Sequence, residues 1–191
     1  MLRVRSVRQL VPALVISGLA LAATATPAHA QDVMSKEAAA VVKAYYLADL
    51  EALRVKFVGL AEAFPADKLS FRPMDGVRST AEVLMLLATE GYGYAPGAVG
   101  APPAMPREEM QKLRAISDKA QIIDHLNKGF AYAKTEIGKI DAATLTGKRK
   151  MGNNERNAVE SIGAVLGDMH EHLGQLIAYA RMNKIVPPWS K

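Results

Sequence analysis

Four long stretches of this 191-residue chain repeat their apolar residues at intervals of three or four positions, and this period constrains the fold most. The stretches cover residues 33–63, 79–88, 117–141 and 155–183. Such a repeat places apolar side chains on one face of an α-helix, whereas a half-buried strand alternates at every second residue. We find no alternating stretch and no longer internal repeat. The sequence therefore predicts an all-α protein, a four-helix bundle without a sheet.

The expected helix ends follow from capping and breaking residues. Pro65 ends the first helix, because a proline disfavours helical geometry in the residue before it. Ser79 and Glu82 have the spacing of a capping box and begin the second helix. The segment 91–106 is rich in glycine and proline and is expected to end that helix. Ser117 is the expected cap of the third helix.

The remaining segments are expected to be connections. Pro106 is placed to open a short helix over residues 106–114, and residues 142–154 are polar and aperiodic, which indicates an irregular connection. The fourth helix ends before Pro187. The Pro-rich loop 96–106 is a candidate contact surface for a protein partner.

The first 30 residues have the three parts of a secretory signal peptide. Three arginines precede an apolar run from about residue 10 to residue 22, and Ala28-His29-Ala30 provides a small-residue cleavage site. The apolar run is shorter than the roughly 20 residues of a spanning helix. We expect cleavage after Ala30, a periplasmic or secreted protein without a stable membrane anchor, and one domain over residues 31–191.

Charge and composition exclude several classes of protein. The net charge of +5 arises from 24 basic and 19 acidic residues, and removal of residues 1–30 leaves 21 basic and 19 acidic ones. No basic run remains, so we expect no nucleic-acid binding. The chain has no cysteine, which excludes disulfides, a lipid-anchored cysteine and the usual haem attachment motif.

The last helical stretch contains two of the four histidines, His170 and His172. At about 100° per residue they are separated by roughly 160° around the helix, so they cannot bind one ion together. His172 instead shares a stripe with Asp168, one turn earlier, and with Gln175 and Tyr179. A carboxylate and an imidazole are both zinc ligands, but either also orients the other by hydrogen bonding. The residues alone leave a metal site and a structural pair as alternatives.

Two segments resemble the DinB-like (DinB/YfiT-like) family of four-helix-bundle proteins. Residues 64–95 are similar to that family's entry into its second helix, and residues 168–190 are similar to its last helix. The most specific local piece is His172-Leu173-Gly174-Gln175. The resemblance covers nearly all of the chain after the expected signal peptide.

The resemblance implies a divalent metal ion between the helices. Its ligands would be a histidine of the second helix and a histidine or carboxylate four residues before a histidine of the fourth, which Asp168 and His172 match. Enzymatic relatives use the metal to activate a thiol or water for transfer, isomerisation or hydrolysis. The second-helix ligand falls on Leu86, which has no lone pair. Glu90 lies one turn later, and it either completes a shifted triad or pairs with a basic residue or solvent at the bundle edge.

Two functions from different classes follow. Leu86 favours an exported DinB-like bundle with an incomplete metal triad and no cofactor, acting as a binding or structural module. The alternative is a hydrolase or thiol transferase that depends on zinc, nickel or manganese held by His172, Asp168 and, in the shifted arrangement, Glu90. The sequence thus leaves open whether the protein is an enzyme. The candidate partners are a small molecule and a second copy of the chain in a homodimer.

Overall fold

The computed structural model describes residues 34–151 and 153–190, and these belong to the unit from Gln31 to Lys191. The expected signal peptide, residues 1–30, lies outside the described residues. Within the described part, no helix combines the length and the apolar character that crossing a membrane requires.

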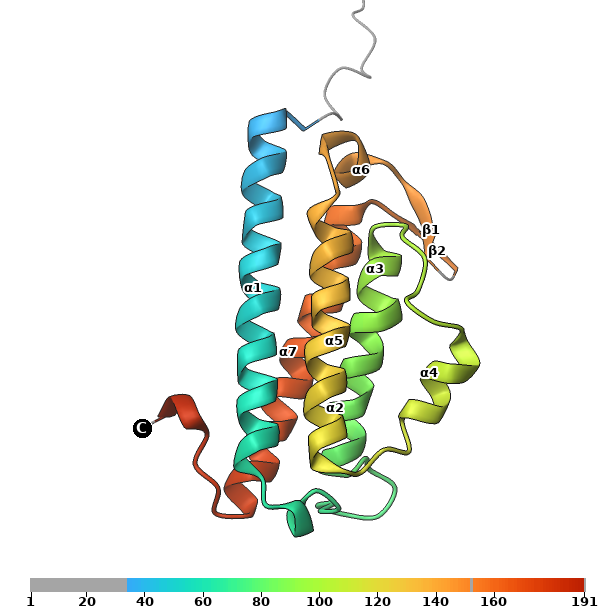
Figure 1. Ribbon diagram of the computed structural model, residues 1–191. Coiled ribbons are helices and arrows are strands. Elements are labelled where there is room, and N and C mark those ends of the chain that lie inside the picture. Colours follow the sequence, from blue (N-terminus) through green and yellow to red (C-terminus); the bar gives the residue numbers. More distant parts are fainter. Residues whose placement is uncertain (1–33, 152, 191) are drawn as a thin grey trace, which may run out of the picture. The chain divides into compact units, whose positions relative to one another are not determined.

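Four helical segments run side by side and form the bundle (Figure 1). They are α1 (Lys36–Ala63), α2 (Thr80–Thr89) with its continuation, α5 (Lys119–Gly138) and α7 (Ala158–Met182). Both α1 and α2 pack against α5 and α7. The predicted all-α bundle is therefore confirmed, and α2 lies beside α7, the helix that contains His172.

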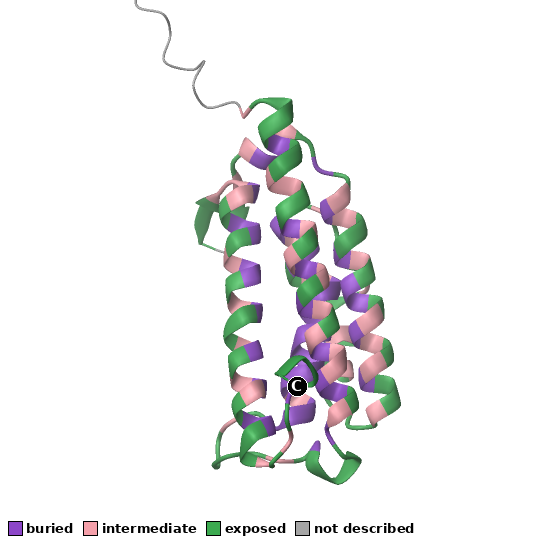
Figure 2. Ribbon diagram, turned by 90° about the vertical axis from the view of Figure 1, so that its left-hand side faces the viewer, coloured by how far each residue is buried: buried purple, intermediate pink, exposed green. Residues whose placement is uncertain are grey.

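The core follows the apolar period of the sequence. Figure 2 shows that the buried residues lie along the sides of the helices that face one another. Nine residues of α2 are buried, from Thr80 to Thr89 with only Glu82 more accessible. A helix that is apolar on nearly all sides gains most by such enclosure, which explains why α2 is central in the packing.

The capping box of α2 is present as predicted. The Ser79 hydroxyl accepts a hydrogen bond from the Glu82 amide at 3.2 Å, and the Glu82 carboxylate accepts one from the Ser79 amide at 2.9 Å. The predicted cap of the third helix is wrong by one residue, because the Asp118 carboxylate accepts from the Gln121 amide. Asn157 caps α7.

The connection over residues 142–154 is more regular than predicted, and the expectation that the protein has no sheet is wrong, because this connection forms a two-stranded one. It contains α6 (Ala142–Thr146) and an antiparallel hairpin of β1 (Arg149–Met151) and β2 (Asn154–Arg156). Strands of three residues are too short for alternation to be visible in the sequence. The short helix expected after Pro106 is present as α4 (Arg107–Leu113), and the 3-10 turns η2 (Ala66–Lys68) and η4 (Pro188–Ser190) complete the structure.

The second helix does not end where the glycines begin, which corrects the prediction. It continues through a π-helical turn, η3 (Glu90–Tyr94), into α3 (Ala95–Ala98). The reason is a backbone contact with α5. A Cβ atom added to Gly91 would lie 2.6 Å from the carbonyl carbon of Gly129, and one added to Gly129 would lie 2.5 Å from the Ala88 oxygen. Close packing therefore overrides the low helix propensity of glycine at this point.

We predict that Gly129→Ala destabilises the protein by about 1 to 3 kcal/mol, the usual range for overpacking. The added methyl group has no space against the Ala88 carbonyl unless the two helices separate. Gly138→Ala is the matched control on the same helix, because a Cβ atom there meets nothing within 4 Å. Urea unfolding should show the control as stable as the unmodified protein, and equal stability of the two variants would contradict the packing argument.

Candidate metal centre

Glu90, Asp168 and His172 come together between the second helix and α7. One ligand atom of each side chain lies within 4.8 Å of the other two. Asp168 and His172 are one turn apart on α7, with 4.0 Å between Asp168 Oδ2 and His172 Nε2. Glu90 is the first residue of η3, and π-helical turns occur often at functional sites.

The Glu90 carboxyl group is buried without adequate polar partners. Glu90 is 7% exposed, and its Oε2 has no hydrogen-bond partner among the described residues. Burial raises its pKa to about 8, and the negative charge of Asp168 contributes to the rise, whereas Arg114 and Arg78 oppose it. Among the described residues no ion pair joins Glu90 to a basic side chain, and the residue is buried rather than exposed at the bundle edge.

A chain of hydrogen bonds selects the tautomer of neutral His172. The Tyr179 hydroxyl donates to the Arg78 carbonyl at 3.1 Å and accepts from Gln175 Nε2 at 2.8 Å. The oxygen of the Gln175 amide then faces His172 Nδ1 at 2.9 Å. Because a backbone carbonyl can only accept, this order of donors requires the proton of His172 to be on Nδ1. Nε2 of a neutral His172 consequently presents a lone pair on the side of Asp168.

His170 lies outside this cluster, as its position on the helix predicts. Its Nε2 is 3.0 Å from both carboxylate oxygens of Asp49 on α1. The side chain is 47% exposed. The two histidines of α7 therefore have different neighbours, and only His172 contributes a ligand-type atom to the cluster.

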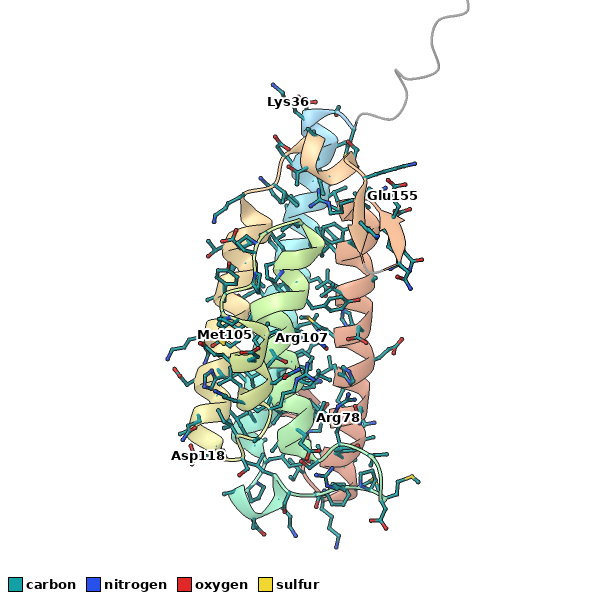
Figure 3. All side chains as sticks on the ribbon, turned by 90° about the vertical axis from the view of Figure 1, so that its right-hand side faces the viewer. Lys36, Arg78, Met105, Arg107, Asp118 and Glu155 are labelled. Atoms are coloured by element: carbon teal, nitrogen blue, oxygen red, sulfur yellow. The ribbon has the colours of Figure 1, made fainter. Side chains whose placement is uncertain are left out.

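A cavity of about 400 Å³ adjoins the cluster through Glu90. Residues of η3 and α3 form one wall, and the Pro-rich segment and α4 form the other. Figure 3 shows α4 in front of the green α2 and α3 segment, with Arg107 at its start. The cavity is in the size range of small-molecule sites in proteins.

The profile of the DinB superfamily matches residues 49–176, which is more than half of the chain. The protein belongs to the DinB superfamily. The matched region contains Glu90, Asp168 and His172. No curated protein matches the chain at a significant level.

Leu86 occupies the position where the DinB resemblance places a ligand of the second helix. It is buried but does not belong to the contiguous core cluster, and its carbonyl accepts a hydrogen bond from Thr89 Oγ1 at 2.7 Å. It offers no ligand atom. The expectation of an incomplete triad nevertheless needs correction, because Glu90 brings a third ligand-type side chain from the next turn of the same helix.

The three residues of this DinB superfamily protein have the properties of a site for a divalent cation. A buried carboxylate beside a second one is unfavourable when both are ionised, unless a cation compensates them. Glu90 Oε2 has a free lone pair, and His172 Nε2 is oriented by Gln175. Three protein ligands with a remaining open position are typical of catalytic zinc sites. The donor set therefore fits a divalent metal ion.

We predict that Glu90→Gln changes how the stability of the metal-free protein depends on pH. The folded-state pKa of Glu90, about 8, lies above the ordinary glutamate value of 4.5. The stability that the folded state gains from protonated Glu90 is therefore fully present below pH 4.5 and is lost as the pH rises through about 8. The free energy of unfolding falls by at most about 1.4 kcal/mol per pH unit from this one group. Glutamine does not titrate, so the Glu90→Gln variant lacks this contribution.

Chemical unfolding of chelator-treated protein between pH 5 and pH 9 tests this expectation. The free energy of unfolding should fall with pH more steeply in the unmodified protein than in the Glu90→Gln variant. Glu171→Gln, an exposed position on α7, is the control and should follow the unmodified protein. Parallel curves for Glu90→Gln and the unmodified protein would show that folding does not raise the pKa of Glu90.

Proposed function

We propose that this DinB superfamily protein is an exported metal-dependent enzyme, a hydrolase or thiol transferase, whose cation is held by Glu90, Asp168 and His172. The observation that carries the proposal is the convergence of three ligand atoms within 4.8 Å, one of them from a buried carboxyl group whose Oε2 lacks a partner. By itself, Leu86 at the position of a ligand favours a metal-free module. The position of Glu90 now supports the enzyme.

The donor types suit zinc, nickel or manganese. An imidazole nitrogen is a common ligand for zinc and nickel, and carboxylate oxygens also suit manganese. Two carboxylates would neutralise the charge of a divalent ion in a partly buried site. A bound ion would supply Lewis acidity, which lowers the pKa of a water or thiol next to it.

The side chains of this protein have separate tasks in such a site. Gln175 holds the His172 ring and its tautomer, so that Nε2 is available without a proton to displace. Asp168 and Glu90 supply the negative charge. Glu90 also lines the neighbouring cavity, so a small molecule bound there would be next to the reacting centre.

Leu86 supports a second function, a metal-free binding module with the same cavity. In that case Glu90 would keep its proton at neutral pH, because burial and Asp168 raise its pKa to about 8. The polar cluster would then serve only to bind a ligand. The metal content of the protein distinguishes these two functions.

We predict close to one equivalent of divalent metal in protein purified without chelator and without a metal-affinity tag. Elemental analysis by mass spectrometry gives the content, and titration with zinc, manganese and nickel gives the affinities. His172→Ala removes a direct ligand, and Glu90→Gln replaces an anionic ligand by a neutral amide. Each should lower the affinity by about 100-fold or more, since loss of indirect partners already costs about 10- to 100-fold.

His170→Ala is the matched control, because it removes the same side chain two positions away while leaving the cluster intact. Its affinity should equal that of the unmodified protein. A content well below one equivalent, together with no measurable binding in the titrations, would contradict the enzyme and leave the binding module.

Export is the remaining part of the proposal, and it is supported by the order of the charged, apolar and small-residue regions in residues 1–30. We predict that protein recovered from the periplasmic fraction begins at Gln31. Intact-mass measurement identifies the first residue. An uncleaved chain in the membrane fraction would contradict export by a cleaved signal peptide.

A further inference from the structure

We infer that the cavity beside Glu90 binds a small organic anion with an apolar body, whose charged group is held by Arg107 and Arg114. The inference rests on the proposed function, because it names the class of substrate that the same site would take. Its basis is the distribution of charge and apolar surface around the cavity.

Arg107 is the first residue of α4, and Arg114 is its C-cap, which keeps helical backbone geometry. They are seven residues apart, so they differ by only about 20° around the helix axis. Met110 and Gln111, between them in the sequence, also line the cavity, whereas Glu108 and Glu109 do not. The side of α4 that faces the cavity is therefore basic and apolar, and its acidic residues lie elsewhere.

Neither arginine forms an ion pair with a carboxylate in the part of the chain that the structure describes. No ion pair of the described residues includes Arg107 or Arg114. Glu90 is the one acidic side chain among the described residues that line the cavity, and it belongs to the metal cluster. A guanidinium group presents a planar fork of donors that matches a carboxylate or phosphate group. Two such groups without a partner favour an anionic ligand.

The rest of the wall is suited to an apolar body. Gly93, Gly97, Ala101, Pro103 and Met110 contribute to a cavity of about 400 Å³. A Cβ atom added to Gly93 would lie 3.0 Å from the Met110 sulfur, so this glycine lets α4 approach the second helix closely. The space is too small for a folded partner and matches a small molecule. The anionic group of that molecule would meet the arginines, and its apolar body would lie against these small and apolar side chains.

The segment that covers the cavity is attached to the bundle. The Ala104 amide donates to the Tyr92 carbonyl at 2.8 Å, and the Tyr132 hydroxyl donates to the Pro102 carbonyl at 2.9 Å. Leu113 and Ile116 pack partly buried against the core. The backbone that carries the arginines is consequently fixed beside the cavity before any ligand binds, which reduces the ordering cost of binding.

Isothermal titration calorimetry on the mature protein, zinc-loaded and metal-free, tests the inference with three probes. They are 4-phenylbutyrate, phenyl phosphate and the neutral 4-phenylbutan-1-ol. At least one anion should bind about tenfold or more tightly than the alcohol, because charge-assisted hydrogen bonds contribute that much. Preference for 4-phenylbutyrate identifies a carboxylate ligand, and preference for phenyl phosphate a phosphate ligand. Equal binding of all three probes, or binding of none, overturns the inference.

Variants locate the binding. The double substitution Arg107→Gln and Arg114→Gln should weaken anion binding by about tenfold or more and leave alcohol binding unchanged. Arg181→Gln is the control, because it makes the same kind of substitution, with the loss of one positive charge, at an exposed position on α7 outside the cavity. Equal affinities of the double variant and the control would place the anion elsewhere and overturn the inference.

A steric variant gives an independent result. Gly97 lines the cavity, and a Cβ atom added there meets nothing within 4 Å, so Gly97→Leu should exclude all three probes. Gly138→Leu, which also has open space but lies outside the cavity, should bind them normally. Unchanged probe binding by folded Gly97→Leu would overturn the inference.

Metal content measured on the same samples separates the two proposals. Full metal content without anion selectivity overturns only the inference, and absent metal with arginine-dependent anion binding overturns only the enzyme.

Discussion

The backbone contact between Gly91 and Gly129 is the constraint on which the site depends. At this point the second helix and α5 approach so closely that no Cβ atom fits between them. The contact lies directly after Glu90, where the helix widens into its π-helical turn. It holds a helix through a segment whose glycines would otherwise end it. The position of Glu90, opposite α7, is therefore set by packing against a third helix that contributes no ligand.

The electrostatic cost of that position is concentrated on one carboxyl group. Glu90 is enclosed next to Asp168, and the two guanidinium groups that affect its pKa, those of Arg78 and Arg114, offset this cost only in part. In contrast, Nδ1 of His172 has a hydrogen-bond partner in Gln175, and the chain of hydrogen bonds continues through Tyr179 to a backbone carbonyl. An oriented imidazole beside a carboxyl group with a raised pKa is the pattern expected of a pre-organised functional site. Such sites often reduce the stability of the folded protein because their groups are arranged to bind a ligand.

The sequence predicts those structural features that depend on residues close together in the chain. The capping box of Ser79 and Glu82 depends on residues three apart, and the opposite positions of His170 and His172 follow from the helix period alone. The continuation of the second helix was not predictable, because it depends on Gly129, which is distant in the sequence. The burial of Glu90 and its cavity likewise require α7 and α4 to be in place, and the short hairpin of β1 and β2 leaves no detectable period.

The one-turn difference between Leu86 and Glu90 has a consequence for what the site can reach. Leu86 does not line the cavity under α4, whereas Glu90 belongs both to that cavity and to the candidate metal site. A ligand at the earlier position would leave the cluster without this shared residue. A ligand at the later position joins the cluster to a cavity that two arginines, Arg107 and Arg114, also line. The lack of a ligand at Leu86 is therefore compatible with a complete set of three ligand-type residues, because Glu90 supplies the third of them and also lines the adjoining cavity.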